Sequence, residues 1–131
     1  MKKATKKSKT TKPSKTLVFG LIAAVVSVAL DQWSKYEVIK TIKPIGFKNL
    51  IEVNGAQILN FTYVENRGAS FGIFQGQIPL LSIITGLFLI FALYLLIRKI
   101  INEKAQIWAL CMLIGGGAGN LIDRIARGYV V

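Results

Sequence analysis

An unbroken apolar run of twenty residues extends from Ile78 to Ile97 (IPLLSIITGLFLIFALYLLI) and contains no charged residue. A helix of that length rises about 30 Å, which matches the hydrocarbon core of a bilayer. Similar apolar runs extend from Leu17 to Leu30 and from Ala105 to Ile122. The first of these rises only about 21 Å, so its helix must continue past Asp31 to cross a membrane. Together the three runs predict a membrane protein with several spans.

A cleaved signal peptide is the alternative interpretation of the first run. A lysine-rich segment precedes it, and the small residues Ser27 and Ala29 stand near its end, where a cleavage site would be. The two later runs favour a membrane span instead, because they already indicate a chain that stays in the bilayer.

Most of the net charge is concentrated at the N-terminus. The chain has 17 basic and 6 acidic residues, a net charge of +11, and seven of its lysines precede Leu17. We predict that residues 1–16 form a disordered basic tail that meets anionic membrane lipid rather than nucleic acid. Because cytoplasmic segments carry the excess of Lys and Arg, this tail and the turn containing Arg98, Lys99 and Lys104 are predicted to be cytoplasmic.

The residue types exclude several kinds of catalysis. The chain has no histidine and a single cysteine. A His-built metal site, a Ser-His-Asp triad, a Cys-His pair and an internal disulfide are therefore impossible. We interpret Cys111 as an apolar packing residue of the third run. Carboxylates, Lys, Arg and Tyr are left as the groups able to do chemistry.

The segment between the first two runs, from about Lys40 to Gln77, is predicted to face the outside of the cell. Within it, Ala56 to Val64 (AQILNFTYV) is rich in β-branched and aromatic residues, and the turn-forming pair Asn54-Gly55 precedes this stretch. We therefore predict a small β-structured patch on the outer membrane surface.

Two groups of polar residues lie within or at the end of the apolar spans. Asp31 and Lys35 are four residues apart on one helical face, so they can form a pair. Asn120, Asp123 and Arg124 have helical spacing at the end of the third run. Because the first and third spans cross the membrane in the same direction, both groups lie at the same depth and can meet in one pocket. Alternatively, these side chains are interfacial anchors that extend to water.

Small residues accompany the second polar group. Gly115 and Gly119 form a small-xxx-small pair, which lets a neighbouring helix approach closely. A polar loop of small residues, 66–72 (NRGASFG), leads into the second run and brings a third polar element to the outer face.

Two kinds of chemistry suit these residues. Asp31 and Asp123 are the only aspartates, and two carboxyl groups in a low-dielectric pocket can share one proton and activate water, as in aspartic proteases. The same acids, with Lys35, also suit the proton or ion pathway of a small transporter or channel subunit. A membrane scaffold without chemistry is a third interpretation.

Four motifs follow one another from Asp31 to Val131. They are Asp31-Gln32-x-x-Lys35, Asn66-x-Gly68-Ala69-x-Phe71, Gly116-Gly117-Ala118-Gly119-Asn120-Leu121-Ile122-Asp123-Arg124 and Gly128-x-Val130-Val131. In their order, and in the hydropathy between them, they resemble the motifs of the lipoprotein signal peptidases, the bacterial signal peptidase II family. The third motif is specific, whereas the first is weak.

The resemblance implies an all-α polytopic protein of the bacterial inner membrane, with three of the family's four transmembrane helices and a small β-structured cradle on the extracytoplasmic side. It implies an aspartic endopeptidase that removes the signal peptide from diacylglyceryl-modified prolipoproteins, cutting before the lipidated cysteine. It implies no metal or organic cofactor. We expect a monomer whose partners are the lipid-modified substrate and membrane lipid.

The family's two catalytic aspartates lie outside this sequence. One directly follows the Gly-x-Val-Val stretch and the other lies on a fourth span, whereas the sequence stops at Val131. We therefore predict that residues 17–131 are a membrane peptidase domain that is incomplete at its C-terminus and inactive alone. For the same reason, the pair Asp31 and Asp123 is set aside as a catalytic dyad.

The resemblance also implies roles for six polar residues. Asp31 and Lys35 steady the first span. The residues that line the substrate site are Asn66, Asn120, Asp123 and Arg124. Of these, Arg124 and Asn66 are expected to touch the substrate backbone, since Arg offers a fork of donors and Asn both a donor and an acceptor.

Overall fold

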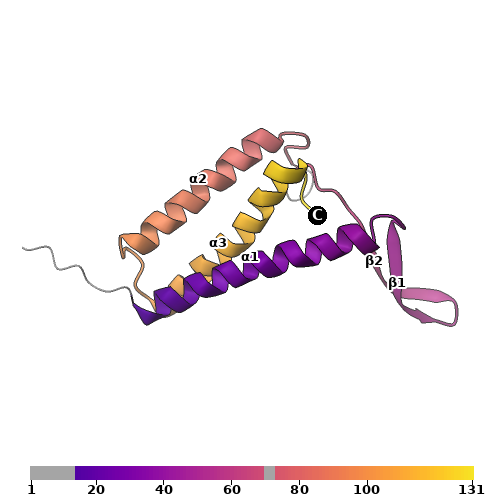
Figure 1. The fold of residues 1–131 in the computed structure, drawn as a ribbon, viewed down its shortest axis with the longest axis horizontal. Coiled ribbons are helices and arrows are strands. Elements are labelled where there is room, and N and C mark those ends of the chain that lie inside the picture. The colour runs from indigo at the N-terminus through magenta and orange to yellow at the C-terminus, as the bar shows by residue number, and fades with distance from the viewer. Residues whose placement is uncertain (1–13, 70–72) are drawn as a thin grey trace, which may run out of the picture.

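The computed structural model describes residues 14–69 and 73–131 as three helices and one β-hairpin (Figure 1). In chain order the elements are α1 (Lys15–Thr41), β1 (Phe47–Val53), β2 (Ala56–Thr62), α2 (Ile78–Ile97) and α3 (Lys104–Arg127). All three helices are long and apolar enough to cross a membrane. The predicted all-α membrane architecture with a small β-structured element is thus confirmed.

The helices begin and end where local chemistry satisfies their terminal groups. Ser14 caps α1, because its side-chain oxygen accepts a hydrogen bond of 3.2 Å from the Leu17 N–H. The helix therefore begins at Lys15, two residues before the predicted domain boundary; the rest of the predicted basic tail, residues 1–13, lies outside the described residues. At the other end α1 continues past Asp31 to Thr41, as its length requires.

The helix α3 ends in a left-handed cap. Gly128 has φ = 76°, a conformation that costs glycine little, and its N–H donates to the Arg124 carbonyl oxygen at 3.2 Å. The cap turns the chain sharply, so that residues 129–131 run back beside the end of the helix rather than continuing along its axis.

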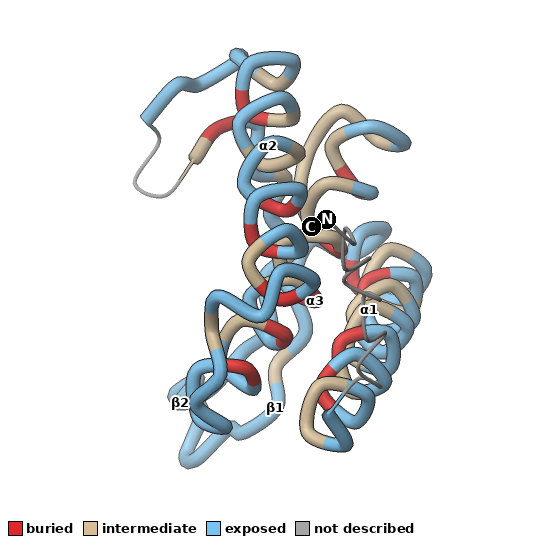
Figure 2. The backbone as a smooth tube through the Cα atoms, turned by 90° about the vertical axis from the view of Figure 1, so that its left-hand side faces the viewer, coloured by how far each residue is buried: buried red, intermediate tan, exposed pale blue. Residues whose placement is uncertain are grey.

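The helix α3 packs between the other two helices (Figures 1 and 2). Its contact with α1 is close because small residues face one another. A Cβ added at Gly115 would lie 3.0 Å from the Ala24 carbonyl oxygen, and one added at Gly20 would lie 2.8 Å from the Cys111 sulfur. The predicted close approach at Gly115 is confirmed, and Cys111 is fully buried, as expected of a packing residue.

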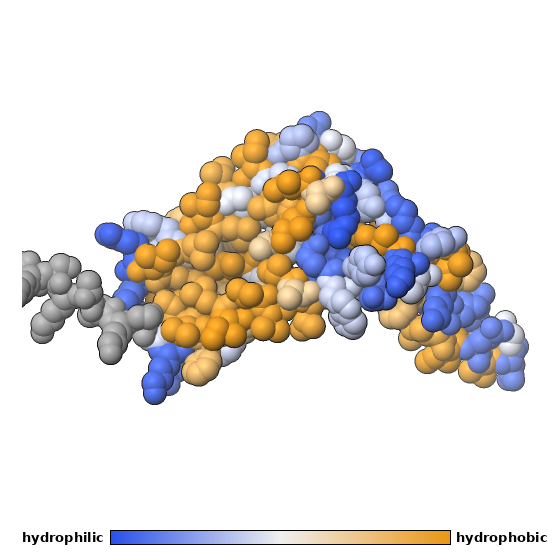
Figure 3. All heavy atoms as spheres, in the orientation of Figure 1, coloured by the Kyte–Doolittle hydropathy of each residue, from blue (hydrophilic) through white to orange (hydrophobic). Residues whose placement is uncertain are grey.

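The outer surfaces of the helices are apolar. Large side chains such as Phe19, Ile83 and Phe91 are more than half exposed. On the face shown in Figure 3, apolar residues form a continuous band over the helices, with polar residues gathered at both of its ends. Such a band is the surface expected of a protein whose solvent is lipid.

The hairpin extends beyond the C-terminal end of α1 (Figure 1). β1 and β2 are antiparallel, and the two turn residues Asn54 and Gly55 have φ = 52° and φ = 80°. Two successive positive φ angles give the turn that matches the natural twist of a hairpin. The predicted Asn-Gly turn and following strand are confirmed, whereas the first strand, Phe47–Val53, was not predicted.

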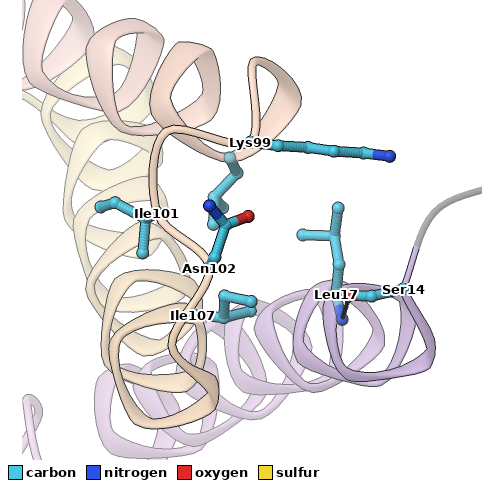
Figure 4. A pocket seen from close by; sticks show the side chains of 7 residues that line it. Ser14, Leu17, Lys99, Ile101, Asn102 and Ile107 are labelled. Atoms are coloured by element: carbon cyan, nitrogen blue, oxygen red, sulfur yellow. Dashed lines mark hydrogen bonds between the residues drawn. The ribbon is translucent and has the colours of Figure 1, made fainter. Parts of the chain in front are cut away.

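The two ends of the helix bundle differ. The start of α1 and the turn between α2 and α3 share one end, where Ser14, Lys99 and Asn102 line a cavity of about 150 Å³ (Figure 4). The hairpin and the C-terminal residues share the other end. The sequence predicts that the tail and the basic turn lie on one side of the membrane. The start of α1, which follows the tail, and the turn between α2 and α3 do lie at one end of the bundle.

Candidate functional site

Lys35 is the centre of a buried polar network between α1 and α3. Its side chain is 10% exposed, and its Nζ lies 2.8 Å from the Asp31 Oδ2 and 2.9 Å from the Asp123 Oδ2. It also donates to the Asn120 Oδ1 at 3.2 Å. The three protons of one ammonium group thus meet three oxygens from two helices. The predicted Asp31–Lys35 pair and the convergence of the two polar groups are confirmed.

Asp123 accepts bonds from several directions. Besides Lys35, its carboxylate accepts from the side chains of Gln32 at 3.1 Å and of Arg127, and from the backbone N–H of Val131 at 3.2 Å. Its side chain has no exposed surface. α1 thus packs over the carboxylate, and the expectation that Asp123 lines the substrate site stays a prediction.

The same contacts argue against a dyad of Asp31 and Asp123. A catalytic dyad consists of two carboxyl groups that share one proton because they cannot both ionise. Here one ammonium group, that of Lys35, lies within 3 Å of both carboxylates and compensates their charge. Both carboxylates are therefore held in place by the same side chain.

Gln32 joins the two aspartates of this network to the α3 backbone and to Arg127. Its Nε2 lies 3.1 Å from each of the Asp31 Oδ2, the Asp123 Oδ1 and the Gly119 carbonyl oxygen, and its Oε1 accepts from Arg127 at 3.1 Å. We call the whole set the interhelical network; its members are Asp31, Gln32, Lys35, Asn120, Asp123 and Arg127. Sequence reasoning gave no role to Gln32 or Arg127, although Arg127 follows Asp123 at the i+4 spacing that pairs charges on a helix.

Gly119 makes room for the network. A Cβ at this position would lie 2.8 Å from the Asp31 Cγ, closer than real carbon contacts. The glycine-rich stretch therefore does two things: Gly115 lets the helix backbones approach, and Gly119 leaves the space that the Asp31 carboxylate occupies.

Asn66 pairs with the C-terminal segment through its backbone. Its N–H donates to the Val130 carbonyl oxygen at 2.8 Å, and the Val130 N–H donates back at 2.9 Å. Its side-chain oxygen accepts from the Gly68 N–H at 2.9 Å and so stabilises its own loop. The polar loop and the fourth motif thus meet, although Phe71 of the loop lies outside the described residues.

Arg124 stands on the half-buried side of the last turn of α3. Its Nε is buried and makes no hydrogen bond to any part of the chain that the structure describes. A buried guanidinium donor without a partner costs free energy unless a ligand or water accepts from it. Arg124, which is next to Asp123 of the network, therefore has an Nε–H group available to donate to a ligand.

A cavity of about 330 Å³ opens between the end of α1 and the chain leaving the hairpin. The residues that line it are Asp31, Ser34, Lys35, Val38, Thr62, Val64 and Val131. One wall is polar and belongs to α1, and the other is mostly apolar. The cavity lies at the hairpin end of the bundle, directly beside the interhelical network.

A second polar cluster lies outside the helices, around Glu65. Its carboxylate lies 2.9 Å from the Arg67 Nη2 and 3.0 Å from the Lys43 Nζ, and these hydrogen bonds lower the pKa of Glu65 to about 2. The bond to Glu65 is also the main reason that the pKa of Lys43 is raised. Burial, followed by the hydrogen bond with Tyr129, raises the pKa of Tyr63 to about 12.

The match to a family model identifies the chain. Residues 22–131 match the model of signal peptidase (SPase) II, which covers the interhelical network, the hairpin and the C-terminal segment. The chain belongs to the signal peptidase II family. The family likeness inferred from the four motifs is thereby confirmed, and the chain is a bacterial membrane protein of a protease family.

Similar signal peptidases come from several bacteria. Proteins named lipoprotein signal peptidase are 38% identical in Caldanaerobacter subterraneus, covering 85% of this chain and 73% of the relative, and 36% identical in Halalkalibacterium halodurans, covering 84% and 68%. In Enterococcus faecalis the identity is 36%, covering 88% and 68%.

The fold is also that of a solved bacterial membrane enzyme, determined by the in meso method at 2.3 Å resolution. The two structures superpose with a TM-score of 0.71 at 33% sequence identity. The match covers 86% of this chain and 66% of the other. Sequence and fold comparisons thus agree on the family, and the described helices and hairpin correspond to about two thirds of the solved enzyme.

Proposed function

We propose that the chain forms the substrate-binding part of an aspartic endopeptidase that removes signal peptides from diacylglyceryl-modified prolipoproteins, cutting before the lipidated cysteine. The observation that carries the proposal is the cavity beside the interhelical network, at the hairpin end of a lipid-exposed bundle. A signal peptide reaches its cleavage site from the bilayer, so its enzyme needs a polar site at the boundary between lipid-facing helices and an outer element.

The orientation proposed for the chain puts the hairpin outside the cell. The seven lysines that precede Leu17 lead into α1 at the opposite end of the bundle, where Arg98 and Lys99 follow α2 and Lys104 begins α3. Lys40, Lys43 and Lys48 near the hairpin make the bias imperfect, so the orientation rests on the tail. An excess of Lys and Arg is typical of the cytoplasmic side. The cavity then opens on the extracytoplasmic side, where prolipoproteins are processed in this proposal.

The roles proposed for the polar residues follow from their contacts. Arg124 has an unused buried donor, which suits a carbonyl oxygen of the substrate backbone. Asn120 lies beside it on α3 and already accepts from Lys35, so its amide nitrogen is the part that suits a substrate carbonyl. Asn66 acts through its backbone pair with Val130, which holds the loop against the C-terminal segment.

The catalytic carboxylates in this proposal are the aspartates that the family has after the Gly-x-Val-Val stretch and on a fourth span. Asp123 contributes by holding the Val131 N–H, which fixes the backbone from which the first of those aspartates follows. Asp31 and Lys35 hold α1 against α3. In this chemistry one carboxylate activates water and the other protonates the carbonyl oxygen of the scissile bond.

Cleavage of a lipid-modified precursor in proteoliposomes tests the proposal. We expect a chimera in which the C-terminal part of the Caldanaerobacter relative follows Val131 to cleave, and the 131-residue chain alone not to. In the chimera, Arg124→Ala should lower kcat/KM about tenfold to a hundredfold, by loss of one or two charged hydrogen bonds. Arg98→Ala, at the opposite end, is the matched control.

Three results would contradict the proposal. An inactive chimera would remove the peptidase function itself. Cleavage by the 131-residue chain that Asp123→Asn abolishes would restore the dyad of Asp31 and Asp123. Ion flux through liposomes that contain the chain, lost in Lys35→Met, would support a transporter or channel subunit instead.

A further inference from the structure

Five side chains from three separate segments converge outside the membrane, around Glu65. Besides its pairs with Lys43 and Arg67, Glu65 accepts from the Tyr63 hydroxyl at 3.2 Å. Lys43 follows α1, and residues 63–67 follow the hairpin. We call this cluster the outer tether; its members are Lys43, Tyr63, Glu65, Arg67 and Tyr129.

Tyr129 brings the C-terminal segment into the outer tether. The Lys43 Nζ donates to its hydroxyl at 3.2 Å, and the Tyr63 hydroxyl lies 3.3 Å from the same oxygen. The Lys43 Nζ also lies 5.5 Å from the centre of the Tyr129 ring, and the Arg67 Cζ lies 5.6 Å from it. Both distances are within the range of a cation–π interaction. One aromatic side chain thus contacts residues from both other segments.

Three residues of the outer tether are sequence neighbours of Asn66 and Val130, whose backbones pair. Glu65 and Arg67 flank Asn66 in the sequence, and Tyr129 precedes Val130. Because side chains alternate along an extended chain, the flanking residues meet on one side of the backbone pair. The tether therefore clamps the same two segments that the two backbone hydrogen bonds join.

The segments that are clamped in this way form a wall of the cavity. Thr62 and Val64 come from the hairpin side and Val131 from the C-terminal side. Any separation of the two segments would widen the cavity and displace Val131, whose N–H is held from the opposite side by Asp123. The position of Val131 is thus fixed by the interhelical network on one side and by the outer tether on the other.

We propose that Tyr129 is a positioning residue of the peptidase: through the outer tether it holds residues 128–131 against residues 62–67 and so sets the geometry of the cavity wall. The inference rests on the proposed function, since it concerns the same cavity. It adds to that function a device outside the membrane, in which Lys43, Glu65 and Tyr129 act on the site without touching the substrate.

Amide hydrogen exchange in the purified 131-residue chain in micelles tests the clamp without any need for cleavage. We expect Tyr129→Phe to make the Asn66 and Val130 amides exchange about threefold to tenfold faster, the effect of losing one or two hydrogen bonds. Amides in the middle of α3, such as that of Cys111, should keep their protection. Tyr94→Phe, an exposed tyrosine of α2, is the matched control and should change neither rate.

Glu65→Gln is the second variant, because it removes the charge at the centre of the tether and leaves Tyr129 intact. We expect it to accelerate the same two amides. Unchanged exchange at Asn66 and Val130 in both variants would overturn the proposal, since the tether would then be a solvated surface cluster. A loss of protection throughout α3 in both variants would overturn it too, because the effect would then not be local.

In the active chimera, a positioning role predicts a particular kinetic signature. Tyr129→Phe should lower kcat several-fold and leave KM near that of the unsubstituted chimera, because the residue aligns the reacting groups without binding substrate. A raised KM with an unchanged kcat would contradict positioning. If the unsubstituted chimera does not cleave, the proposed function has failed, whereas the exchange result still decides whether Tyr129 clamps the two segments.

Discussion

The interhelical network and the outer tether are built from the same kinds of residue but differ in their surroundings. In the network, the side chains of Lys35 and Asp123 are 10% and 0% exposed, whereas in the tether those of Lys43 and Arg67 are 44% and 59% exposed. A buried charge that loses its partner costs several kcal/mol, while an exposed pair is weakened by water and salt. Burial, rather than the number of ion pairs, therefore decides what each cluster can do.

The comparison assigns a different physical task to each cluster. The network fixes the helices, because separating α1 from α3 would break the ion pair between Lys35 and Asp123 and the hydrogen bonds of Gln32 to α3 in a low-dielectric environment. The tether is too exposed to hold helices together, but it can align the two segments that Asn66 and Val130 join. Four variants test this difference, and their expected effects decrease in the order given.

The largest loss of stability is expected for Lys35→Met. The substitution leaves Asp31 and Asp123 without their shared cation, and breaking a buried pair in this way costs about 3–5 kcal/mol. Unfolding of the purified chain in mixed micelles, followed by circular dichroism during an SDS titration, measures the loss. Lys40→Met, on the exposed side of α1, is the matched control. Equal losses in the two variants would mean that the network does not hold the helices.

A smaller loss is expected when a methyl group is added at Gly119. Its Cβ would lie 2.8 Å from the Asp31 Cγ, and overpacking of this kind costs about 1–3 kcal/mol. Gly116→Ala is the control, because no atom lies within 4 Å of the Cβ it would add. Alanine favours the helix, so Gly116→Ala should be neutral or slightly stabilising. The same SDS titration compares the two, and a reversed order would contradict the packing described here.

Lys43→Met should destabilise the chain less than Lys35→Met does, and its effect should be largest at low salt. At about 1 M salt the Debye length falls to about 3 Å, which screens exposed pairs far more than buried ones. Unfolding at low and high NaCl therefore separates the clusters: the effect of Lys43→Met should shrink, and that of Lys35→Met should persist. Two effects with the same salt dependence would remove the distinction between network and tether.

The smallest effect is expected from acidification of the tether. The pKa of Glu65 is lowered from its usual 4.5 to about 2 by its bonds from Arg67 and Lys43. A lowered folded-state pKa contributes stability that is complete above about pH 4.5 and is lost as the pH falls toward 2. The groups that face the carboxylate are Lys43, Tyr63 and Arg67.

Unfolding of the native chain and of Glu65→Gln at several pH values measures this contribution. The difference between the two should be constant near neutral pH and should shrink below about pH 4.5. Glu52→Gln, on the exposed strand β1, is the matched control. A difference that grows on acidification would have the wrong sign and would contradict the ion pairs assigned to Glu65.

Features that depend on neighbouring residues were predictable from the sequence. The length of the second apolar run gave α2 with both of its ends, since nothing within it interrupts a helix. The i, i+4 spacing of Asp31 and Lys35 predicted their ion pair. The shared direction of the first and third spans predicted that this pair would contact Asn120 and Asp123. In each case the period of a helix and the thickness of a bilayer fix the answer.

Features that depend on packing were not predictable. Helical spacing placed Asp123 on the right face of α3 but gave no indication that α1 would cover it completely. Gln32 belongs to the first motif, but its hydrogen bonds join it to Gly119 and Arg127, which are 87 and 95 residues away along the chain. Local sequence gives no indication of such contacts. The strand Phe47–Val53 was missed because its sequence alternates poorly, and it pairs mainly because β2 follows a favourable turn.

The outer tether shows the same limit most clearly. Lys43, Glu65 and Tyr129 are separated along the chain, and no local pattern links them. They meet because α1 and α3 end at the same level. Since the network sets that level, the tether follows from the network and cannot be predicted from the local sequence. Long-range contacts of this kind need the fold before they can be found.

Cysteine labelling from outside intact cells tests most directly the claim that α1 and α3 bring their polar residues to one extracytoplasmic site. In a Cys111→Ala background, the exposed positions to compare are Ser34 on α1, Ala126 on α3 and Asn102 at the opposite end. Single Ser34→Cys and Ala126→Cys variants should react with a membrane-impermeant maleimide, and Asn102→Cys should react only after permeabilisation. Labelling of positions 34 and 126 from opposite sides of the membrane would contradict the account.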